Sequence, residues 1–318
     1  MNNSTNKASN MNESMLKETG SSSSYTVSFI LPTGREIPAP GFGTWLIDDE
    51  EARTIIKDAL KTGFRHIDTA EYYGNEAGIG QAIRDYLQET GLNRDAIFLT
   101  SKAWISHRGR EAVKKACEDS LKRFGMDHVD LYLLHWPANE KEFPDTWDAI
   151  NQDSWKGMMD LYKEGKAKAI GVSNFLPHQL ASLLEMEIPP MVNQFEFHPG
   201  WFEPANTAYC SIHHVIPEGY MPLGRGEVLT NPVIEQIAKT HQKTPAQICL
   251  RYALQHGVIP LPKSTHIKRM QENLDLFDFE LSDKEMKDID GIGITGYSGH
   301  DPATVILDIP SKPTNKTK

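Results

Sequence analysis

Short apolar runs alternate along the chain with longer stretches in which apolar residues recur every three or four positions. The recurring pattern is typical of amphipathic helices, and a short continuous apolar run is typical of a strand buried on both faces. Helical faces are predicted within residues 52–60, 79–87 and 113–124. A later helix is predicted to begin at Thr244-Pro245, an N-cap followed by proline, and to end at Gly257.

Eight strands are predicted between these helical stretches. The first ends near Thr44, and the others cover residues 65–69, 97–101, 131–134, 169–172, 191–193, 215–219 and 258–261. Alternating strands and helices without a break in composition predict an α/β fold of one domain, closed as a (β/α)₈ TIM barrel.

A doubly wound sheet is the alternative architecture. It is expected to carry a glycine-rich phosphate turn that opens the first helix. The Gly41-Phe42-Gly43-Thr44 stretch lacks the third glycine, and four acidic residues follow at 48–51. Because these carboxylates would repel a pyrophosphate, the barrel is favoured.

The N-terminal part of the chain divides in two. Residues 1–24 are polar and predict a disordered tail, because they hold few apolar side chains to bury. The barrel domain is predicted over residues 25–318, with an N-terminal β-hairpin that turns at Pro32-Thr33-Gly34.

Charge narrows the possible ligands. The formal net charge is −10, and the three lysines after residue 310 leave about −13 on the chain between the balanced tail and the C-terminus. So acidic a surface argues against binding to nucleic acid or to an anionic membrane. An anionic ligand therefore needs a local basic cluster, and Lys263, Lys268 and Arg269 form one after the last predicted strand.

The cysteines and the apolar runs give no sign of a secreted or membrane-spanning protein. Three cysteines, at 117, 210 and 249, are too few and too scattered to predict a disulfide framework or a zinc site. No signal-peptide pattern and no apolar stretch of membrane-spanning length is found, so we expect a cytoplasmic protein.

Polar residues follow the predicted strands, at the end where barrel enzymes place their active sites. They are Asp68, Lys102, His135, Ser173, Gln194, Tyr220 and Lys263. Each alone could be a helix cap, a solvated side chain or a structural histidine. Together their ionisable groups would point into one cleft, and that coincidence favours an active site.

Asp68, Tyr73, Lys102 and His135 suit one reaction. A phenol has an ordinary pKa near 10, a neighbouring ammonium lowers it, and a carboxylate keeps that ammonium charged and oriented. Tyr73 is then a candidate general acid toward a carbonyl oxygen, with His135 as a second hydrogen-bond donor. Reduction of a carbonyl also needs a hydride, which implies a reduced nicotinamide cofactor.

Four motifs carry a resemblance to the aldo-keto reductases, and in particular to bacterial relatives of the diketogluconate reductases. They are GFRHIDTAEYYGNE at 63–76, LLHWP at 133–137, GVSNF at 171–175, and PKS at 262–264 followed by Arg269 and Glu272-Asn273. The resemblance runs from about Tyr25 to Val305.

The resemblance implies roles for individual residues. Asp68, Tyr73, Lys102 and His135 would form the catalytic tetrad, with Tyr73 as the proton donor. NADPH would be the cofactor, with the adenosine 2′-phosphate held by Lys263, Ser264 and Arg269. The other implied cofactor contacts are Thr44, Asp68, Ser173, Asn174, Gln194, Tyr220, Pro222, Leu223, Glu272 and Asn273.

Substrate contacts are less sharply indicated. Trp45, Trp104 and Trp136 follow strands and are candidates, with His135, for an apolar pocket mouth, although each also suits core packing. Met221 stands where the family usually has a serine near the pyrophosphate. Ala103 and Ile105 replace the commoner leucine and asparagine around Trp104.

The sequence therefore predicts an NADPH-dependent, monomeric reductase of small aldehydes, ketones or keto-sugars. Two alternatives remain open at this stage. One is a Schiff-base lyase with Lys102 as the nucleophile. The other is a non-catalytic module that binds nicotinamide and senses redox state.

Overall fold

An eight-stranded parallel sheet forms the centre of the computed structural model, which describes residues 16–19 and 26–307. Strands that are consecutive in the chain are neighbours in the sheet. They are β4 (Phe42–Gly43), β5 (His66–Asp68), β6 (Phe98–Ala103), β7 (Leu131–Leu134), β8 (Ile170–Ser173), β9 (Val192–Glu196), β10 (Ile216–Tyr220) and β11 (Ile259–Pro260). All eight predicted strands are confirmed, with shifts of a few residues at their ends.

The first and last strands meet and close the barrel. Gly41 and Gly43 donate backbone hydrogen bonds to the carbonyl oxygens of Pro260 and Pro262, each at 3.0 Å. A Cβ on Gly43 would lie 2.9 Å from the carbonyl oxygen of Leu261, so only glycine allows the two backbones to approach so closely. The predicted (β/α)₈ barrel is confirmed.

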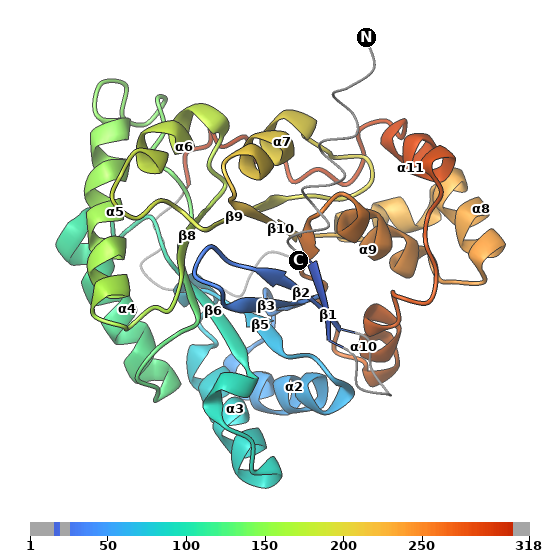
Figure 1. Cartoon of the computed structure of the whole chain (residues 1–318), viewed down its shortest axis with the longest axis horizontal. Helices are drawn as coiled ribbons and strands as arrows, with labels where there is room; N and C mark the ends of the chain where they lie inside the picture. The colour runs from blue at the N-terminus through green and yellow to red at the C-terminus, as the bar shows by residue number, and fades with distance from the viewer. Residues whose placement is uncertain (1–15, 20–25, 308–318) are drawn as a thin grey trace.

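Helices surround the sheet (Figure 1). They are α2 (Asp49–Thr62), α3 (Glu76–Thr90), α4 (Arg110–Phe124), α5 (Trp147–Lys163), α6 (Pro177–Leu184), α7 (Pro204–Ile212), α8 (Pro232–His241), α9 (Pro245–Gln255), α10 (Ile267–Leu274) and α11 (Asp283–Asp290). The predicted apolar faces are buried, as at Ile56 and Leu60 of α2. The Thr244 hydroxyl accepts from the backbone N–H of Gln247, which confirms the predicted N-cap of α9.

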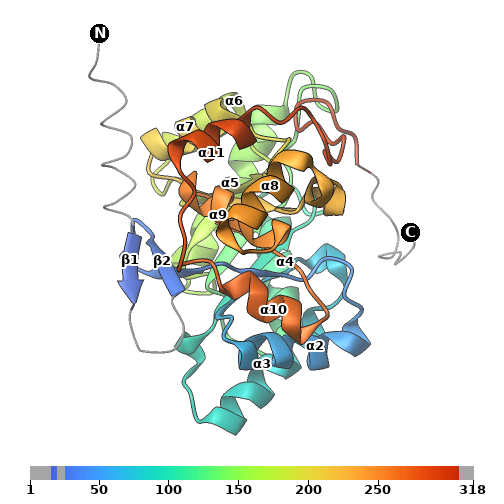
Figure 2. The ribbon, with the colours of Figure 1, turned by 90° about the vertical axis from the view of Figure 1, so that its right-hand side faces the viewer.

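A small antiparallel sheet projects from one end of the barrel (Figure 2). The predicted hairpin is present as β2 (Thr26–Ile30) and β3 (Glu36–Ala39). β1 (Leu16–Thr19) pairs with the other side of β2, although these four residues fall within the predicted tail. This pairing gives hydrogen-bond partners to the backbone N–H and C=O groups that would be unpaired at an open edge of β2. The rest of that tail lies outside the described residues.

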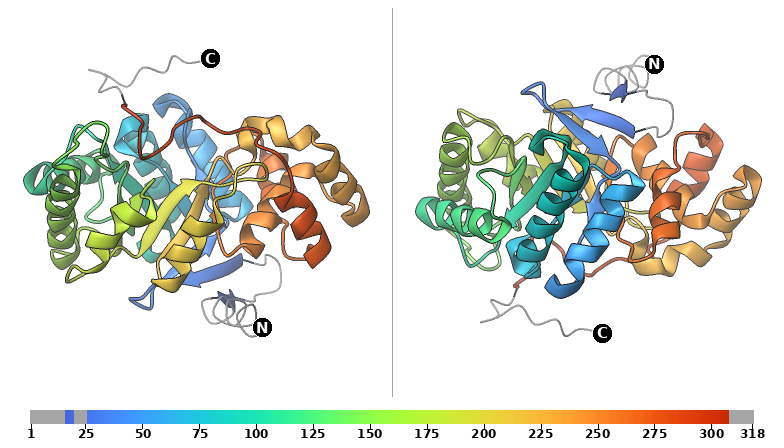
Figure 3. Two further views of the ribbon diagram at one scale, coloured as in Figure 1. Left: turned by 90° about the horizontal axis from the view of Figure 1, so that it is seen from above. Right: turned by 90° about the horizontal axis from the view of Figure 1, so that it is seen from below.

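The last described segment crosses the opposite end of the barrel (Figure 3). Two hydrogen bonds are among the contacts that hold it there. The Asn139 side chain donates to the carbonyl oxygen of Val305 at 2.7 Å, and the backbone N–H of Ser298 donates to Glu196 Oε1 at 2.9 Å. The carboxyl termini of the barrel strands lie at this end. Among the residues described, no helix is both long and apolar enough to cross a membrane.

A buried carboxylate fastens the hairpin to the barrel. Asp130 is 1 % exposed, and its oxygens lie 2.7 Å from Arg35 of the hairpin turn and 2.8 Å from Arg94. The same carboxylate accepts the backbone N–H of Leu99 in β6 at 3.0 Å. One side chain thus joins the hairpin turn to the stretch that leads into β6, two segments that are far apart in the chain.

Asp130→Ala is therefore expected to destabilise the protein by about 3 kcal/mol, because two arginines and a buried N–H lose their shared acceptor. Urea unfolding followed by circular dichroism measures this loss. Glu187→Ala removes the partner of Lys163 in an exposed ion pair and should shift the urea midpoint far less. Equal shifts in the two variants would contradict the anchoring role.

Candidate active site

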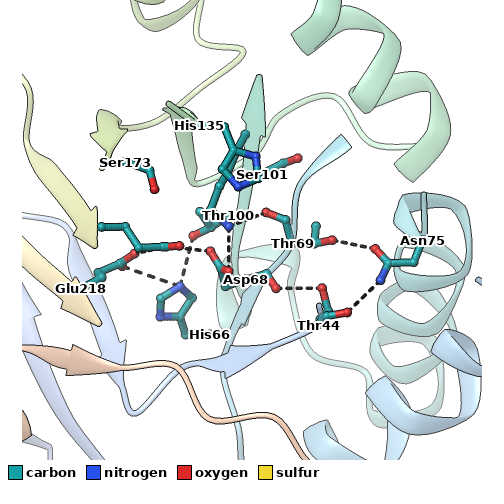
Figure 4. Close-up of polar contacts among 12 residues, drawn as sticks. Thr44, His66, Asp68, Thr69, Asn75, Thr100, Ser101, His135, Ser173 and Glu218 are labelled. Atoms are coloured by element: carbon teal, nitrogen blue, oxygen red, sulfur yellow. Dashed lines mark hydrogen bonds and ion pairs between the residues drawn. The ribbon is translucent and has the colours of Figure 1, made fainter. Parts of the chain in front are cut away.

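The ammonium of Lys102 lies inside the carboxyl end of the barrel, where β5 and β6 bring it against Asp68 (Figure 4). Lys102 Nζ donates to Asp68 Oδ1 at 2.8 Å and to the carbonyl oxygen of Thr69 at 2.9 Å. Both side chains are buried, Lys102 completely. Burial alone would lower the pKa of Lys102, but attraction to Asp68 and Tyr73 outweighs it and raises the pKa above 10.5. Lys102 is therefore charged.

Tyr73 ends a short 3₁₀ turn, η1 (Glu71–Tyr73), that follows β5. The buried side chain of Asn75 holds this turn in place. Its amide donates to the carbonyl oxygens of Thr44 at 3.0 Å and Ile47 at 2.9 Å, and its oxygen accepts from the Thr69 hydroxyl at 2.7 Å. Asn75 thereby ties the loop after β4 to the loop after β5 (Figure 4).

The ring of Tyr73 lies beside Lys102, with its centroid 5.2 Å from Nζ. The sequence predicts that this cation lowers the pKa of the phenol. Burial raises the pKa of Tyr73 more than the charge and hydrogen bond of Lys102 lower it, so the net shift is upward. Lys102 thus acts on the phenol in the expected direction, but burial, of which sequence spacing carries no measure, reverses the net shift. The phenol is protonated at neutral pH.

His135 comes directly after β7 and completes the group of four. Its ring centroid lies 5.7 Å from that of Tyr73, in an edge-to-face arrangement. Burial, reinforced by the charge of Lys102, lowers the pKa of His135 well below 6.5, so the imidazole is neutral. Its Nδ1 is buried and has no hydrogen-bond partner among the described residues.

Several of the predicted cofactor contacts lie on or just after β8, β9 and β10. Asn174 has a φ of 64°, and its amide donates to the carbonyl oxygen of His135 at 3.0 Å and to Ser173 Oγ at 3.1 Å. Its oxygen accepts from the Tyr220 hydroxyl at 2.9 Å. Gln194 Nε2 donates to Asp68 Oδ2 at 2.9 Å. The Thr44 hydroxyl donates to the carbonyl oxygen of Asp68 at 2.9 Å.

Two further groups of candidates flank this centre. After β10 the chain turns sharply, since Met221 has a φ of 50° and its carbonyl accepts from Gly224 at 2.9 Å. Pro222 is buried and Leu223 half-buried in this turn. It leads into a short 3₁₀ segment, η3 (Gly224–Thr230).

The predicted basic cluster follows β11 and continues into α10. Lys263 and Arg269 are exposed, and no ion pair involves either of them within the described part of the chain. Ser264 and Asn273 are buried. Half-buried Glu272 lies 3.8 Å from Lys268, so Lys263 and Arg269 are the two cations of the cluster that remain available to bind an anion.

Stacked aromatic rings form a wall beside Tyr73 and His135. Tyr72 lies between Trp45 and Trp104, with ring centroids at 5.7 Å and 3.9 Å. The Trp104 ring also meets His135 edge-on at 4.9 Å. The ring of Trp136 instead meets that of His300 in the last segment edge-on, with centroids 6.1 Å apart. The structure thus brings two of the three predicted tryptophans together.

A cleft lined in part by Tyr220 was not predicted from the sequence. It is lined by Asn174, Glu196, Trp201, Tyr220, Tyr297 and His300, among others. Trp201 and Tyr297 stack with centroids 3.5 Å apart. Because these rings are almost a hundred residues apart in the chain, spacing alone carried no signal for them.

Comparison with known proteins agrees with this geometry. The model of the aldo/keto reductase family matches residues 40–294. The glyoxal reductase of Bacillus subtilis is 43% identical over 279 residues, covering 87% of this chain and 96% of its own. The oxidoreductase YtbE of the same organism is 42% identical over 274 residues, covering 86% and 95%.

A solved structure extends the likeness to three dimensions. The Bombyx mori aldo-keto reductase in complex with NADP has a TM-score of 0.78 and 32% identity, and the match covers 89% of this chain and 95% of its own. The chain belongs to the aldo/keto reductase family. This family membership makes it an oxidoreductase with a nicotinamide cofactor, whereas the narrower likeness to diketogluconate reductases stays a prediction.

One buried acidic residue of this aldo/keto reductase was missed by the sequence analysis. Glu218 of β10 is fully buried, and Gln194 Nε2 donates to its Oε2 at 2.8 Å. Its only sequence signal is a carboxylate inside an otherwise apolar strand. Burial, followed by the charge of Asp68, raises the pKa of Glu218 to about 8.

The stability of the protein should therefore depend on pH through Glu218. In the unfolded chain this carboxyl titrates near 4.5, so its contribution to stability is complete below that pH and is lost as pH rises toward about 8. Glu218→Gln is neutral at every pH and avoids the loss. The melting temperature of the variant minus that of the wild type should rise between about pH 5 and pH 9, in thermal unfolding by circular dichroism. The exposed Glu187→Gln control should give a flat difference. A flat difference for Glu218→Gln would mean that the carboxyl is ionised throughout.

Proposed function

We propose that this protein reduces the carbonyl group of small aldehydes, ketones or keto-sugars with NADPH, and that Tyr73 donates the proton. The observation that carries the proposal is the buried Asp68–Lys102 pair beside Tyr73, with neutral His135 against the same ring. A nicotinamide, when bound, supplies the hydride that no side chain can give.

Each of the four side chains has a distinct task in this proposal. Tyr73 is protonated, so its hydroxyl can give a proton to a carbonyl oxygen as negative charge develops there. The charge of Lys102 stabilises the phenolate that remains, and Asp68 keeps that charge in place. Neutral His135 can donate one ring N–H to the same oxygen and orient the substrate.

The residues present fit a nicotinamide dinucleotide phosphate. Asn174 and Gln194 place amide groups beside the four side chains, and Tyr220 offers an aromatic face at the end of β10. The exposed cations Lys263 and Arg269 stand where the resemblance places the 2′-phosphate, and a guanidinium matches a phosphate with two parallel hydrogen bonds. Met221 offers no hydroxyl to the pyrophosphate.

The substrate would lie against the aromatic wall of Trp45, Tyr72 and Trp104. A wall of stacked rings excludes water and favours compact substrates with an apolar or planar face. A related protein bears the name glyoxal reductase, and such small dicarbonyls fit this class. The cytoplasmic location and the monomeric state stay predictions.

A Schiff-base lyase is disfavoured by the state of Lys102. A lysine nucleophile must lose its proton, and such lysines usually have a lowered pKa. Attraction to Asp68 raises the pKa of Lys102 instead. A pure redox sensor would have no use for this buried pair beside a phenol.

Tyr73→Phe is expected to lower kcat for NADPH-dependent reduction by at least about 100-fold, because the substrate oxygen loses its proton donor. NADPH oxidation at 340 nm over a panel of aldehydes, diketones and sugar ketones measures the loss, and fluorescence titration should give a nearly unchanged Kd for NADPH. Tyr162→Phe on the outer helix α5 should behave as the wild type. Turnover by Tyr73→Phe close to the wild-type rate would disprove the proton-donor role.

Lys263→Ala and Arg269→Ala are each expected to weaken NADPH binding by about tenfold, the size of one charged hydrogen bond to a phosphate. NADH lacks the 2′-phosphate, so its Kd should change by less than about twofold. Lys268→Ala, an exposed neighbour in the same cluster, serves as the matched control for charge. Equal weakening of both cofactors would remove the assignment of the 2′-phosphate.

A further inference from the structure

Glu218 lies next to the proposed nicotinamide site, yet no step of the proposed reaction uses it. The register of the parallel sheet pairs Glu218 of β10 with Gln194 of β9, so both side chains face the barrel interior. On the other side of β9, Ser173 of β8 is paired with the same glutamine. Gln194 therefore lies between Glu218 and the proposed nicotinamide site. Figure 4 shows Glu218 beside His66 and Asp68.

The amide nitrogen of Gln194 is held between two carboxyl groups. Nε2 donates to Asp68 Oδ2 at 2.9 Å and to Glu218 Oε2 at 2.8 Å. A side-chain amide has two N–H groups, so both are used. Turning the amide over would place its oxygen against two carboxyl oxygens, which cannot both donate. The orientation of the amide is thus set by its neighbours, and no described residue donates a hydrogen bond to Oε1.

The surroundings of Glu218 favour its neutral form. Its Oε1 is buried without a hydrogen-bond partner and lies 3.9 Å from His66 Nε2. His66 Nδ1 faces the carbonyl oxygen of Pro38 at 3.2 Å, an acceptor only, so Nδ1 carries the proton of the neutral ring. His66 Nε2 is then an acceptor, and it accepts a hydrogen bond from the Thr100 hydroxyl at 3.1 Å.

A proton on Oε1 of Glu218 would accordingly point toward His66 and leave Oε2 as the acceptor for Gln194. Burial lowers the pKa of His66 to about 4 and raises that of Glu218 to about 8, so both are largely neutral near pH 7. The charged groups that face Glu218 are Asp68 and Lys102, which pair with each other. Glu218 can thus hold Gln194 without adding a third charge to that pair.

We propose that Glu218 is a positioning residue for the cofactor: with Asp68 it takes both N–H groups of Gln194, and so presents Oε1 of Gln194 to the carboxamide N–H of the nicotinamide. This inference rests on the proposed use of a nicotinamide cofactor. The role assigned to Glu218 of β10 is to favour cofactors that carry a carboxamide. It takes no part in proton transfer.

The test compares two oxidised cofactors in equilibrium binding, measured by quenching of tryptophan fluorescence. One is NADP⁺, and the other is its 3-acetylpyridine analogue, which keeps the carbonyl but has a methyl group in place of the NH₂. The wild type should bind NADP⁺ about fivefold more tightly, the size of one net hydrogen bond. Glu218→Leu should weaken NADP⁺ binding by about the same factor, leave the analogue within about twofold, and so abolish the preference.

Two further variants separate positioning from simple packing. Gln194→Leu should abolish the preference in the same way, because it removes the acceptor itself. Glu218→Gln should keep the wild-type preference, since its amide oxygen still accepts from Gln194 and its NH₂ can donate to His66. Glu218→Met replaces Glu218→Leu if circular dichroism shows that the leucine variant does not fold.

Three results would overturn the assignment of Glu218. They are equal weakening of both cofactors by the apolar variants, an unchanged preference in those variants, or a preference lost in Glu218→Gln. The lack of any preference in the wild type would equally reject it, because Gln194 would then not accept from the carboxamide. If the wild type binds neither NADP⁺ nor NADPH, the proposed function fails instead.

Discussion

The buried ion pair between Lys102 and Asp68 is the constraint on which the site depends. An ammonium with no exposed surface is unfavourable unless a charge and hydrogen bonds replace its water shell. Asp68 and the carbonyl oxygen of Thr69 provide that replacement. The position of the Asp68 carboxylate is fixed in turn, and its second oxygen accepts from Gln194, which is 126 residues away in the chain. In the proposed function, proton transfer and cofactor binding thus share one carboxylate.

This pair also decides the charge of its neighbours. Burial shifts Tyr73, His135 and Glu218 toward their neutral forms, so one cation and one anion remain at the centre of the site. A neutral phenol and a neutral imidazole are hydrogen-bond donors that a carbonyl oxygen can meet without competing charges. The arrangement is therefore suited to a reaction in which negative charge develops on one oxygen atom.

The fold followed from the sequence because its signals are local. Apolar runs, the Thr244 cap and the Pro32–Gly34 turn each depend on neighbouring residues, and the eight strands appear where the runs were found. Closure of the barrel was predicted, but the role of Gly41 and Gly43 in it was not, because it joins residues more than two hundred positions apart. The pairing of β1 with β2 is local in the chain, but it was missed because a polar segment carries no sign of the edge it will cover.

The residue types at the strand ends were determined by the sequence: Asp68, Tyr73, Lys102 and His135 stand where the motifs place them. Their protonation was decided by tertiary structure. The pKa of Tyr73 shifts upward rather than downward because the barrel buries the phenol, and burial is a property of packing. The same is true of Glu218, which resembles an ordinary acidic residue until β9 and β10 close around it. Sequence names the chemical groups, whereas the folded barrel sets the distances and the loss of water that determine what those groups can do.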